Sequence, residues 1–514
     1  MYDGGNLKNW ADKLHEILGQ KDGRIVIYGT GNGGRIAYDA LVRCGRKSKF
    51  VGFIENDNFE LNGRCFQGNP IRHLSDIYSD IDTVIIGAIQ SHQIIQKRLE
   101  SFKKEHCNAN FHIVNLFAYN TFAEEREYLR YVERMLLKKA QETFVQISPH
   151  PFQRQEGDPK VIAWYLPQFH QIPVNNEFLG KGFTEWTNTT QTLPVFTGHY
   201  QPHIPYDVGY YDLNNIEVFK RQIELATHYG IYGFCFHYYW FSGTRLMEKP
   251  LLTFLDNSDL DIKFCLNWAN ENWTSLWDGG DNRIIYRQTL QDGDCDKFVR
   301  DLMPIISDRR YIRIDGRPLL IIYRANMWPK ESTIDFLGEL RMRIKRSFGN
   351  DLYILLTNAR GFDENVVEWG ADAIVEFPPH AIGNLMKAYR PEGYVNPYFV
   401  GNVIDGTSFI ENRRYMISHN SKTYYRSALT SWDNTARKAT TNATIYTGFT
   451  PDTFRKWLMD IMAESRQIHR QEENYVFVNS WNEWAEGSHL EPDLKFGYAY
   501  LQAVKDSLER SRVQ

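Results

Sequence analysis

Short apolar runs, separated by polar or amphipathic stretches, recur along the whole chain. In the first part, four runs rich in β-branched residues alternate with stretches whose apolar positions have helical spacing. Strands that alternate with helices usually pair in parallel and carry helices on both faces of their sheet. The pattern therefore predicts an α/β domain over residues 1–118. Its four predicted strands are residues 24–28, 50–54, 83–87 and 111–114.

The same alternation returns after residue 160, with eight apolar runs and helical stretches between most of them. Eight strands with intervening helices is the count of a (β/α)₈ or TIM barrel, whose active sites lie at the carboxyl ends of the strands. We therefore predict a barrel over residues 158–514. The predicted strands are residues 161–166, 233–237, 263–267, 319–323, 353–357, 373–376, 427–431 and 475–479, and the clearest helices are residues 215–229, 296–306, 332–346 and 452–468.

Between these two parts lies a segment of different character. Residues 119–142 are highly charged, with apolar positions at helical spacing, and predict a connecting helix. The following residues are rich in proline and polar side chains, which is typical of a linker. We assign residues 119–157 to the connection.

Composition excludes several classes of protein. The 59 Lys and Arg residues nearly balance the 63 Asp and Glu residues, for a net charge of −4, which does not indicate a nucleic-acid-binding protein. No apolar run reaches the roughly 18 residues of a membrane span. The amino-terminal residues lack a secretory signal pattern, and six scattered cysteines indicate neither a disulfide framework nor a zinc site. We expect a cytoplasmic protein without a membrane span.

A glycine-rich turn follows the first predicted strand. Gly29, Gly31 and Gly34 fit the GxGxxG pattern between a strand and a helix, where backbone N–H groups can approach a phosphate. Glu55 closes the next strand, where a carboxylate can accept hydrogen bonds from ribose hydroxyls. These residues predict a Rossmann-like domain with a nucleotide site. The alternative is a tight turn in a fold that has lost its ligand.

The segments VGFIENDNFELNGRCFQGNPI and DTVIIGA give this part of the chain a family resemblance. Residues 22–118 resemble the small nucleotide-sugar-binding domains that precede sugar acyltransferases and dehydratases in bacterial polysaccharide pathways. The resemblance implies a nucleotide or nucleotide-sugar ligand rather than a hydride-transfer cofactor.

Aromatic residues concentrate in the predicted barrel. Twelve of the thirteen tryptophans lie beyond residue 160, mostly in short blocks with Asn, Glu, Asp and His after predicted strands. Aromatic rings can stack on the apolar face of a sugar, while carboxylates and amides bind its hydroxyls. The alternative is ordinary core packing. The predicted sugar contacts are Glu185, Trp186, His237, Tyr239, Trp240, Asn267, Trp268, Glu271, Trp432 and Trp481.

Two carboxylates three residues apart, Glu483 and Glu486, follow the last predicted strand. Cleavage of a glycosidic bond usually needs two carboxyl groups, one to protonate the leaving oxygen and one to act on the sugar ring. The flanking Trp481 and Trp484 would exclude water and raise the pKa of one carboxyl. The alternative is a solvated acidic loop.

Five blocks in order make a second resemblance explicit: YLPQFHQIPVNNEFLGKGFTEWTN, GHYQPHIP, YGIYGFCFHYYWFSGTRLMEKP, NWANENW and NSWNEWAEGSHLEPD. Together they resemble the WbsX-type family, which is similar to glycoside hydrolase family 99, the endo-α-mannosidases. That similarity implies a metal-independent barrel with an E-W-x-E motif, matched here by Glu483 and Glu486. It also implies that the first Glu assists attack by the substrate 2-hydroxyl, while the second acts as general acid and base with net retention.

The resemblance favours a retaining endo-glycoside hydrolase of carbohydrate metabolism that acts on a bacterial surface polysaccharide and needs no cofactor for catalysis. WbsX-type proteins occur in O-antigen and capsule pathways and are often labelled glycosyltransferases, so glycosyl transfer is the first alternative. A non-catalytic carbohydrate-binding protein is the second. A metal-dependent transferase would need a DxD pair after a strand, but Asp259 with Asp261 precedes one, and Asp292 with Asp294 lies in a polar loop. We expect no metal site.

Overall fold

A computed structural model describes most of the chain. The described residues are 4–19, 23–55, 63–88, 91–116, 143–274, 284–391, 393, 396, 399–417, 424–438 and 443–512. The predicted connecting helix, residues 119–142, lies outside them. Among the described residues, no helix is both long and apolar enough to cross a membrane.

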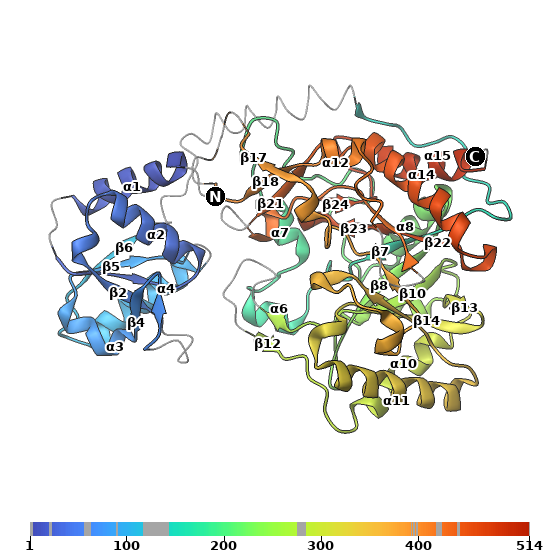
Figure 1. Ribbon diagram of the computed structural model, residues 1–514, viewed down its shortest axis with the longest axis horizontal. Helices are drawn as coiled ribbons and strands as arrows, with labels where there is room; N and C mark the ends of the chain where they lie inside the picture. The colour runs from blue at the N-terminus through green and yellow to red at the C-terminus, as the bar shows by residue number, and fades with distance from the viewer. Residues whose placement is uncertain are drawn as a thin grey trace.

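The first part of the chain folds around a six-stranded sheet in the order β3–β4–β2–β1–β5–β6 (Figure 1). All its neighbouring strands pair in parallel except β3 and β4. Alternate side chains of the central strand face opposite ways, since a strand has a period of two. Ile25 and Ile27 join the core of α1 and α2, while Val26 and Tyr28 join that of α3 and α4. The elements are α1 (Gly4–Leu18), β1 (Ile25–Tyr28), α2 (Asn32–Arg43), β2 (Phe50–Ile54), β3 (Cys65–Phe66), β4 (Asn69–Arg72), α3 (Leu74–Ile77), β5 (Thr83–Ile86), α4 (His92–Glu105) and β6 (His112–Asn115).

The second part is a (β/α)₈ barrel. Its sheet runs β19–β16–β15–β14–β10–β8–β7–β22–β20, and the paired strands on this path are parallel. The sheet closes because β19 and β20 are two pieces of one strand, interrupted at Arg426. The eight strands are β7 (Lys160–Tyr165), β8 (Ile231–Phe241), β10 (Lys263–Trp268), β14 (Arg317–Ile322), β15 (Tyr353–Thr357), β16 (Ala373–Val375), β19 (Tyr424–Tyr425) with β20 (Ser427–Leu429), and β22 (Tyr475–Asn479).

Helices surround the barrel, and shorter strands form within its loops (Figure 1). The helices are α6 (Pro173–Phe178), α7 (Glu185–Gln191), α8 (Ile216–His228), α9 (Lys249–Asp256), α10 (Asp294–Ile306), α11 (Lys330–Phe348), α12 (Thr407–Glu411), α13 (Thr435–Lys438), α14 (Pro451–Ile468) and α15 (Ala499–Arg510). The smaller strands are β9 (Thr244–Leu246), β11 (Trp273–Thr274), β12 (Ile284–Tyr286), β13 (Arg313–Ile314), β17 (Lys387–Tyr389), β18 (Asn402–Asp405), β21 (Thr444–Thr447), β23 (Asn482–Glu483) and β24 (Ser488–His489).

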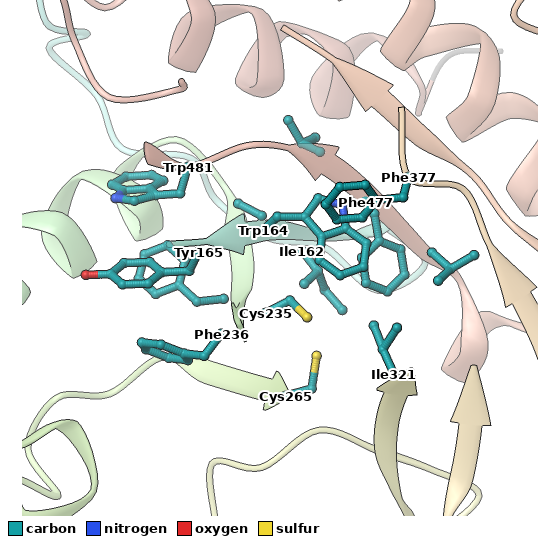
Figure 2. Close-up of a cluster of buried hydrophobic side chains, with 14 of the residues drawn as sticks. Ile162, Trp164, Tyr165, Cys235, Phe236, Cys265, Ile321, Phe377, Phe477 and Trp481 are labelled. Carbon is teal, nitrogen blue, oxygen red and sulfur yellow. The ribbon is translucent and has the colours of Figure 1, made fainter. Parts of the chain in front are cut away.

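The barrel interior is filled by every second residue of its strands. Trp164 of β7 packs against Phe377 and Phe477 at ring-centroid distances of 4.7 and 5.2 Å, and Figure 2 shows the three rings together. The adjacent Tyr165 instead packs against Phe219 of α8 at 6.1 Å. The same alternation decides which residues of each strand can reach the site above the barrel.

All twelve predicted strands form, and most of their ends agree with the predictions within two residues. Part of the predicted linker is packed against the barrel. Val145 accepts from Tyr498 N at 2.9 Å and donates to Phe496 O at 3.0 Å, and Phe152 N donates to His228 O at 2.8 Å. Residues 143–152 are therefore packed on the barrel, although their composition is typical of a linker.

Candidate active site

The two candidate catalytic carboxyls lie on the connection that leaves the last barrel strand. After β22, the chain forms the two-residue strand β23, which ends at Glu483, and a 3₁₀ turn over Trp484–Glu486. The turn ends at Gly487, whose φ of +62° is in the left-handed region that glycine adopts most easily. Glu483 is buried, and the side chain of Glu486 is 18% exposed. The local chain thus holds one carboxyl inside and one at the surface of the site.

A single guanidinium, that of Arg437, binds both carboxyls and a third. Its Nη2 lies 2.8 Å from Glu483 Oε2, its Nη1 lies 2.6 Å from Glu486 Oε1, and its Nε lies 2.6 Å from Glu185 Oε1. The arginine is buried, and burial of charge requires such pairing. Three loops, after β7, β20 and β22, are therefore joined at one point on the carboxyl face of the barrel.

Asp433 places this arginine. Its Oδ1 accepts hydrogen bonds from Thr435 N at 3.0 Å and Thr435 Oγ1 at 2.7 Å, at the start of the one-turn helix α13 that carries Arg437. Its Oδ2 accepts from His199 Nε2 at 2.6 Å and Gln201 Nε2 at 2.8 Å. Burial alone would raise the pKa of Asp433, but His199 and these donors lower it to about 2. Asp433 is thus an ionised anchor between α13 and residues 199–201.

The carboxyl pair has a strong tendency to retain a proton. Burial raises the pKa of Glu483 to about 8; Arg437 opposes the rise, whereas Glu486 and Glu185 add to it. Burial also raises the pKa of Glu486, again against the attraction of Arg437. Because the two groups interact, the proton belongs to the pair rather than to one residue. Burial thus favours the protonated form of both carboxyls, against the attraction of Arg437.

A neutral histidine faces the inner carboxyl. His237 Nε2 lies 3.7 Å from Glu483 Oε1, and Asn267 Nδ2 donates to His237 Nδ1 at 2.9 Å. This bond makes Nδ1 the acceptor, so the ring proton is assigned to Nε2, on the side of Glu483. Burial and the charge of Arg437 lower the pKa of His237 to about 3. His237 is therefore a neutral donor aimed toward the pair.

Glu491 binds the two tryptophans that lie on either side of Glu483 in the sequence. It accepts hydrogen bonds from Trp484 Nε1 at 2.7 Å, Trp481 Nε1 at 3.0 Å, Tyr211 Oη at 2.9 Å and Gln222 Nε2 at 2.7 Å. Burial raises the pKa of Glu491 to about 7 despite these donors. The two buried indoles, on either side of Glu483 in the sequence, are thereby held by one carboxyl.

A second cluster of charges lies after three neighbouring strands of the barrel. Glu271, after β10, binds Arg324 Nη1 at 3.1 Å through Oε1, and binds Arg360 Nε at 3.0 Å and Nη2 at 3.1 Å. Arg324 follows β14, and Arg360 lies in the turn after β15. Sequence reasoning singled out Glu271 but neither of its two arginines.

Two comparisons place this chain among known proteins. A family model described as Glycosyltransferase WbsX matches residues 161–504, which span the barrel from β7 into α15. The chain belongs to the WbsX family. Two uncharacterized proteins named WxcX, from Xanthomonas campestris pv. campestris strains ATCC 33913 and B100, are each 36% identical to it over 358 residues. The match covers 68% of this chain and 50% of each relative, so the chain spans about half the length of the relatives it matches.

Solved structures similar to this WbsX-family chain include a glycoside hydrolase-like protein, with a TM-score of 0.44 and 15% identity over 72% of this chain and 99% of that one. They also include the GH99 endo-α-mannosidase from Bacteroides thetaiotaomicron, in complex with BIS-TRIS-propane, with a TM-score of 0.42 and 14% identity over 69% and 97% of the two chains. The same enzyme without that compound gives a TM-score of 0.42 and 14% identity over 68% and 98%. Likenesses of this degree are too weak to establish a shared activity.

The tryptophans of the WbsX barrel divide into core and surface by the parity of their strands. In β8, His237 and Tyr239 lie on the inner side, so Trp240 lies on the outer side, where it packs 4.9 Å from Phe298 of α10. Trp268 follows the inward Asn267 and packs 4.5 Å from the same Phe298. Both indoles are fully buried, as is Trp481. Their placement does not support the expectation that these three rings contact a sugar.

The remaining predicted sugar contacts have mixed positions. Trp186 is buried beside Trp484 at 5.6 Å, and its Nε1 donates to Tyr211 O at 2.7 Å. Tyr239 accepts from Gln168 Nε2 at 2.9 Å. Trp432 is half-buried and directly precedes Asp433. Among the tryptophans that we predicted to bind sugar, Trp432 is therefore the one with a side chain partly open to solvent.

One group of side chains in the described residues has the composition of a metal site. His203, His489 and Asp493 are buried, and one ligand atom of each lies within 4.8 Å of the others. However, His203 Nδ1 and His489 Nε2 are 2.8 Å apart and hydrogen-bonded to each other. His489 also stacks on Trp484 at 3.8 Å. The two histidines thus join residues 199–203 to the β23–β24 hairpin, and a metal could enter only by breaking that bond.

One alternative DxD pair precedes β10, and the other lies at the start of α10. Asp259 and Asp261 are exposed and precede β10, so they lie toward the amino end of that strand. Asp294 is buried at the start of α10, where its Oδ2 accepts from Ser242 Oγ at 2.8 Å and Gln291 N at 2.9 Å. Asp294 therefore has a local structural role.

The glycine turn of the N-terminal sheet has the expected position between β1 and α2. A Cβ on Gly34 would lie 2.1 Å from Gly29 O, so Gly34 allows the helix to approach the strand. Gly29 has a φ of +107°, and a Cβ on Gly31 would meet no atom within 4 Å. Glu55 Oε2 accepts from Thr30 Oγ1 at 3.2 Å. Two of the glycines thus serve packing or backbone geometry, while Gly31 borders open space.

Proposed function

We propose that this protein is a carbohydrate-active enzyme that breaks glycosidic bonds of a bacterial surface polysaccharide, as a retaining endo-glycoside hydrolase. The observation that carries the proposal is the attachment of Glu483 and Glu486 to one buried guanidinium at the carboxyl face of the barrel. Two carboxyls of opposite protonation are what glycosidic cleavage needs. Membership of a family described as glycosyltransferase supports carbohydrate chemistry.

In this proposal, Glu486 is the general acid and Glu483 is the base at the substrate 2-hydroxyl. Glu483 takes the proton of that hydroxyl while the hydroxyl oxygen attacks the anomeric carbon. The bond to the leaving oxygen breaks, and this oxygen takes a proton from Glu486. Water, deprotonated by Glu486, then attacks the anomeric carbon; its bond to the 2-oxygen breaks, and the 2-oxygen takes its proton back from Glu483, with net retention.

The proton on the free pair must be redistributed for this reaction. Glu483, whose pKa burial raises to about 8, favours the proton in the absence of substrate. A 2-hydroxyl that donates a hydrogen bond to Glu483 would stabilise its ionised form. Substrate binding thereby leaves the proton on Glu486, where the leaving group needs it.

Glycosyl transfer is the second candidate, and the description of the family favours it. The same pair of carboxyls can pass the sugar to an acceptor hydroxyl instead of water. The two reactions differ in their products, since transfer lengthens a glycan and hydrolysis shortens it.

Cleavage assays on bacterial polysaccharides, with the anomer of the product read by NMR, test the proposal. Glu483→Gln and Glu486→Gln should each lower the rate by about 10²-fold or more, as loss of a positioned acid or base does. Glu331→Gln, at an exposed position in the first turn of α11, is the matched control. A 2-deoxy substrate should bind without cleavage. Normal cleavage of that substrate would exclude the anhydro-sugar route, and transfer from a nucleotide-sugar that depends on Mg²⁺ or Mn²⁺ would favour the transferase.

We further propose that the N-terminal domain binds a nucleotide or nucleotide-sugar at Gly29, Gly31, Gly34 and Glu55. The open space at Gly31, at the amino end of the twelve-residue helix α2, supports this proposal. Calorimetry with UDP-sugars, coenzyme A and NAD should detect binding that Gly31→Val abolishes and Gly63→Ala, at another exposed glycine, preserves. If none of these compounds binds, the glycine turn is a structural remnant.

A further inference from the structure

The cluster of Glu271, Arg324 and Arg360 holds more positive charge than its internal pairing requires. One carboxylate faces two guanidinium groups, and arginine remains protonated at all ordinary pH values. The cluster therefore retains one positive charge. An ion pair with a purely structural role would need only one of the two arginines.

One donor of this cluster, on Arg324, has no partner among the described residues. Arg324 Nε is buried and has no hydrogen-bond partner among the described residues. A buried donor without a partner is costly, and native structures usually satisfy such groups with protein, water or a ligand. The side chain of Arg324 is 34% exposed and that of Arg360 is 50% exposed, so part of each guanidinium can be reached from solvent.

The position of Arg360 is fixed by its backbone and its contacts. Its φ is +55°, a left-handed conformation that is unfavourable for a residue other than glycine. Residues held in this way concentrate at functional sites. Both Nε and Nη2 of Arg360 bind Glu271, which leaves Nη1 on the other side of the guanidinium. Glu271 thus orients the group without covering it.

The cluster and the carboxyl pair lie on the same face of the barrel, since both follow the carboxyl ends of its parallel strands. Burial lowers the pKa of Arg360, but Tyr323, Glu271 and Glu486 raise it overall, so the charge of Glu486 is felt at Arg360. Tyr323 follows β14, and its Oη is 3.0 Å from His380 Nε2. Its pKa is raised by burial and by the charges of Glu271, Glu486 and Glu483, partly offset by Arg360. A glycan bound at the pair could therefore reach the two arginines.

We propose that Arg324 and Arg360 bind an anionic group of the glycan, either the carboxylate of a uronic acid residue or a phosphate substituent. The inference rests on the proposed function and names a substrate class for it: an acidic polysaccharide. Guanidinium groups suit both anions because paired N–H donors match two oxygens of a carboxylate or phosphate. A neutral sugar would offer no negative charge to these guanidinium groups.

Ligand-observed NMR on the full-length protein tests the binding, with D-glucuronate, glucose 6-phosphate and glucose as probes. At least one of the anionic probes should bind several-fold more tightly than glucose, and added salt should weaken it. Arg324→Gln and Arg360→Gln should abolish that preference, whereas Arg346→Gln, on the exposed side of α11, should preserve it. Glu271→Gln should strengthen anion binding, because it removes the competing carboxylate. Equal binding of all three sugars, or a preference that both arginine variants retain, would overturn the proposal.

Lysine at either position provides a second measurement if the glutamine variants do not fold. It keeps the charge but loses the paired donors, so Arg360→Lys should weaken anion binding without abolishing it. Glucuronate and glucose 6-phosphate also separate the two sources of the anion.

A cleavage experiment separates this inference from the proposed function. An acidic polysaccharide that the enzyme cleaves should lose at least tenfold in kcat/KM after chemical reduction of its carboxylates or removal of its phosphates. If the treated polysaccharide is cleaved equally well, the inference fails while the hydrolase assignment stands. If anion binding depends on both arginines but no polysaccharide is cleaved or extended, the proposed function fails and the anion site stands.

Discussion

Arg437 Nη2 lies 2.8 Å from Glu483 Oε2, and this contact joins the loops that follow the seventh and eighth strands of the barrel. The same guanidinium binds Glu185 and Glu486, so it offsets the repulsion among three acids in a space that excludes water. The ionisation of the candidate catalytic pair therefore depends on a residue outside the E-W-x-E motif, which opposes the effect of burial.

Removal of this arginine should affect both folding and activity. Arg437→Gln leaves three acids without their cation, and breaking a buried ion pair costs roughly 3–5 kcal/mol. The midpoint of thermal unfolding should fall by several degrees, and glycan cleavage should fall about 10²-fold or more. Arg346→Gln is the control, because this side chain is exposed on α11. Unchanged stability of Arg437→Gln would show that its contacts add nothing to the folded state.

The pH dependence of activity should be bell-shaped, because the reaction needs one protonated and one ionised carboxyl. Burial raises the pKa of both Glu483 and Glu486, to about 8 for Glu483. Activity should fall above about pH 8, where the pair loses its last proton. It should also fall in acid, below the raised pKa of Glu486, where both carboxyls are protonated. Measurement of kcat/KM from pH 4 to pH 10 checks both limbs, and a flat profile would contradict the assignment of the pair.

The stability of the folded protein should also depend on the ionisation of Glu483. A raised pKa in the folded state means that the protonated form is the better accommodated one, so its stabilising contribution is full below the unfolded pKa of 4.5 and is lost as pH rises through about 8. The unfolding temperature should decline between pH 5 and pH 9. Glu483→Gln, which resembles the protonated form, should reduce that decline, whereas Glu331→Gln should not. An identical decline in wild type and Glu483→Gln would refute this account.

Alanine variants of two tryptophans should distinguish a ring that packs in the core from a ring that binds sugar. Trp240 is fully buried against α10, whereas Trp432 is half-buried. Trp240→Ala should destabilise the protein by about 3–5 kcal/mol. Trp432→Ala should instead raise KM several-fold, since an aromatic stacking contact is worth about 0.5–1.5 kcal/mol. Denaturant unfolding and Michaelis kinetics on both variants check this, and the reverse pattern would show that the strand parity was misread.

The barrel should work without the N-terminal sheet, because the candidate active site and the anion cluster lie beyond residue 158. A protein that begins at residue 143 should fold and retain most activity. One that begins at residue 154 should be less stable by about 3 kcal/mol, since it loses the buried Phe152 and the bonds of Val145. Inactivity of the longer form, with its circular dichroism spectrum intact, would assign the first domain a role in the reaction.

The sequence by itself determined the order of elements and much of the site. Apolar runs at strand length and helical spacing between them predicted the barrel strands and four of the six strands of the first sheet, because burial of one face leaves a periodic pattern in the chain. The short strands β3 and β4 were not predicted. Glu483, Glu486, His237, Asn267 and Glu271 could be selected since each lies at or just after a strand. The sequence also contained the alternation of inward and outward side chains along each strand. His237, Tyr239 and Asn267 point inward, so the alternation predicts that Trp240 and Trp268 lie outside the barrel.

Only the tertiary structure decided which charges meet. Arg437 is 46 residues from Glu483 and 252 from Glu185, and closure of the barrel brings their loops together. Arg324 and Arg360 likewise reach Glu271 across neighbouring strands. No local pattern marks these arginines, because a side chain that serves a distant partner leaves no period in its own segment. Their protonation states depend on burial and on charges from several loops at once, and these exist only after the sheet has closed.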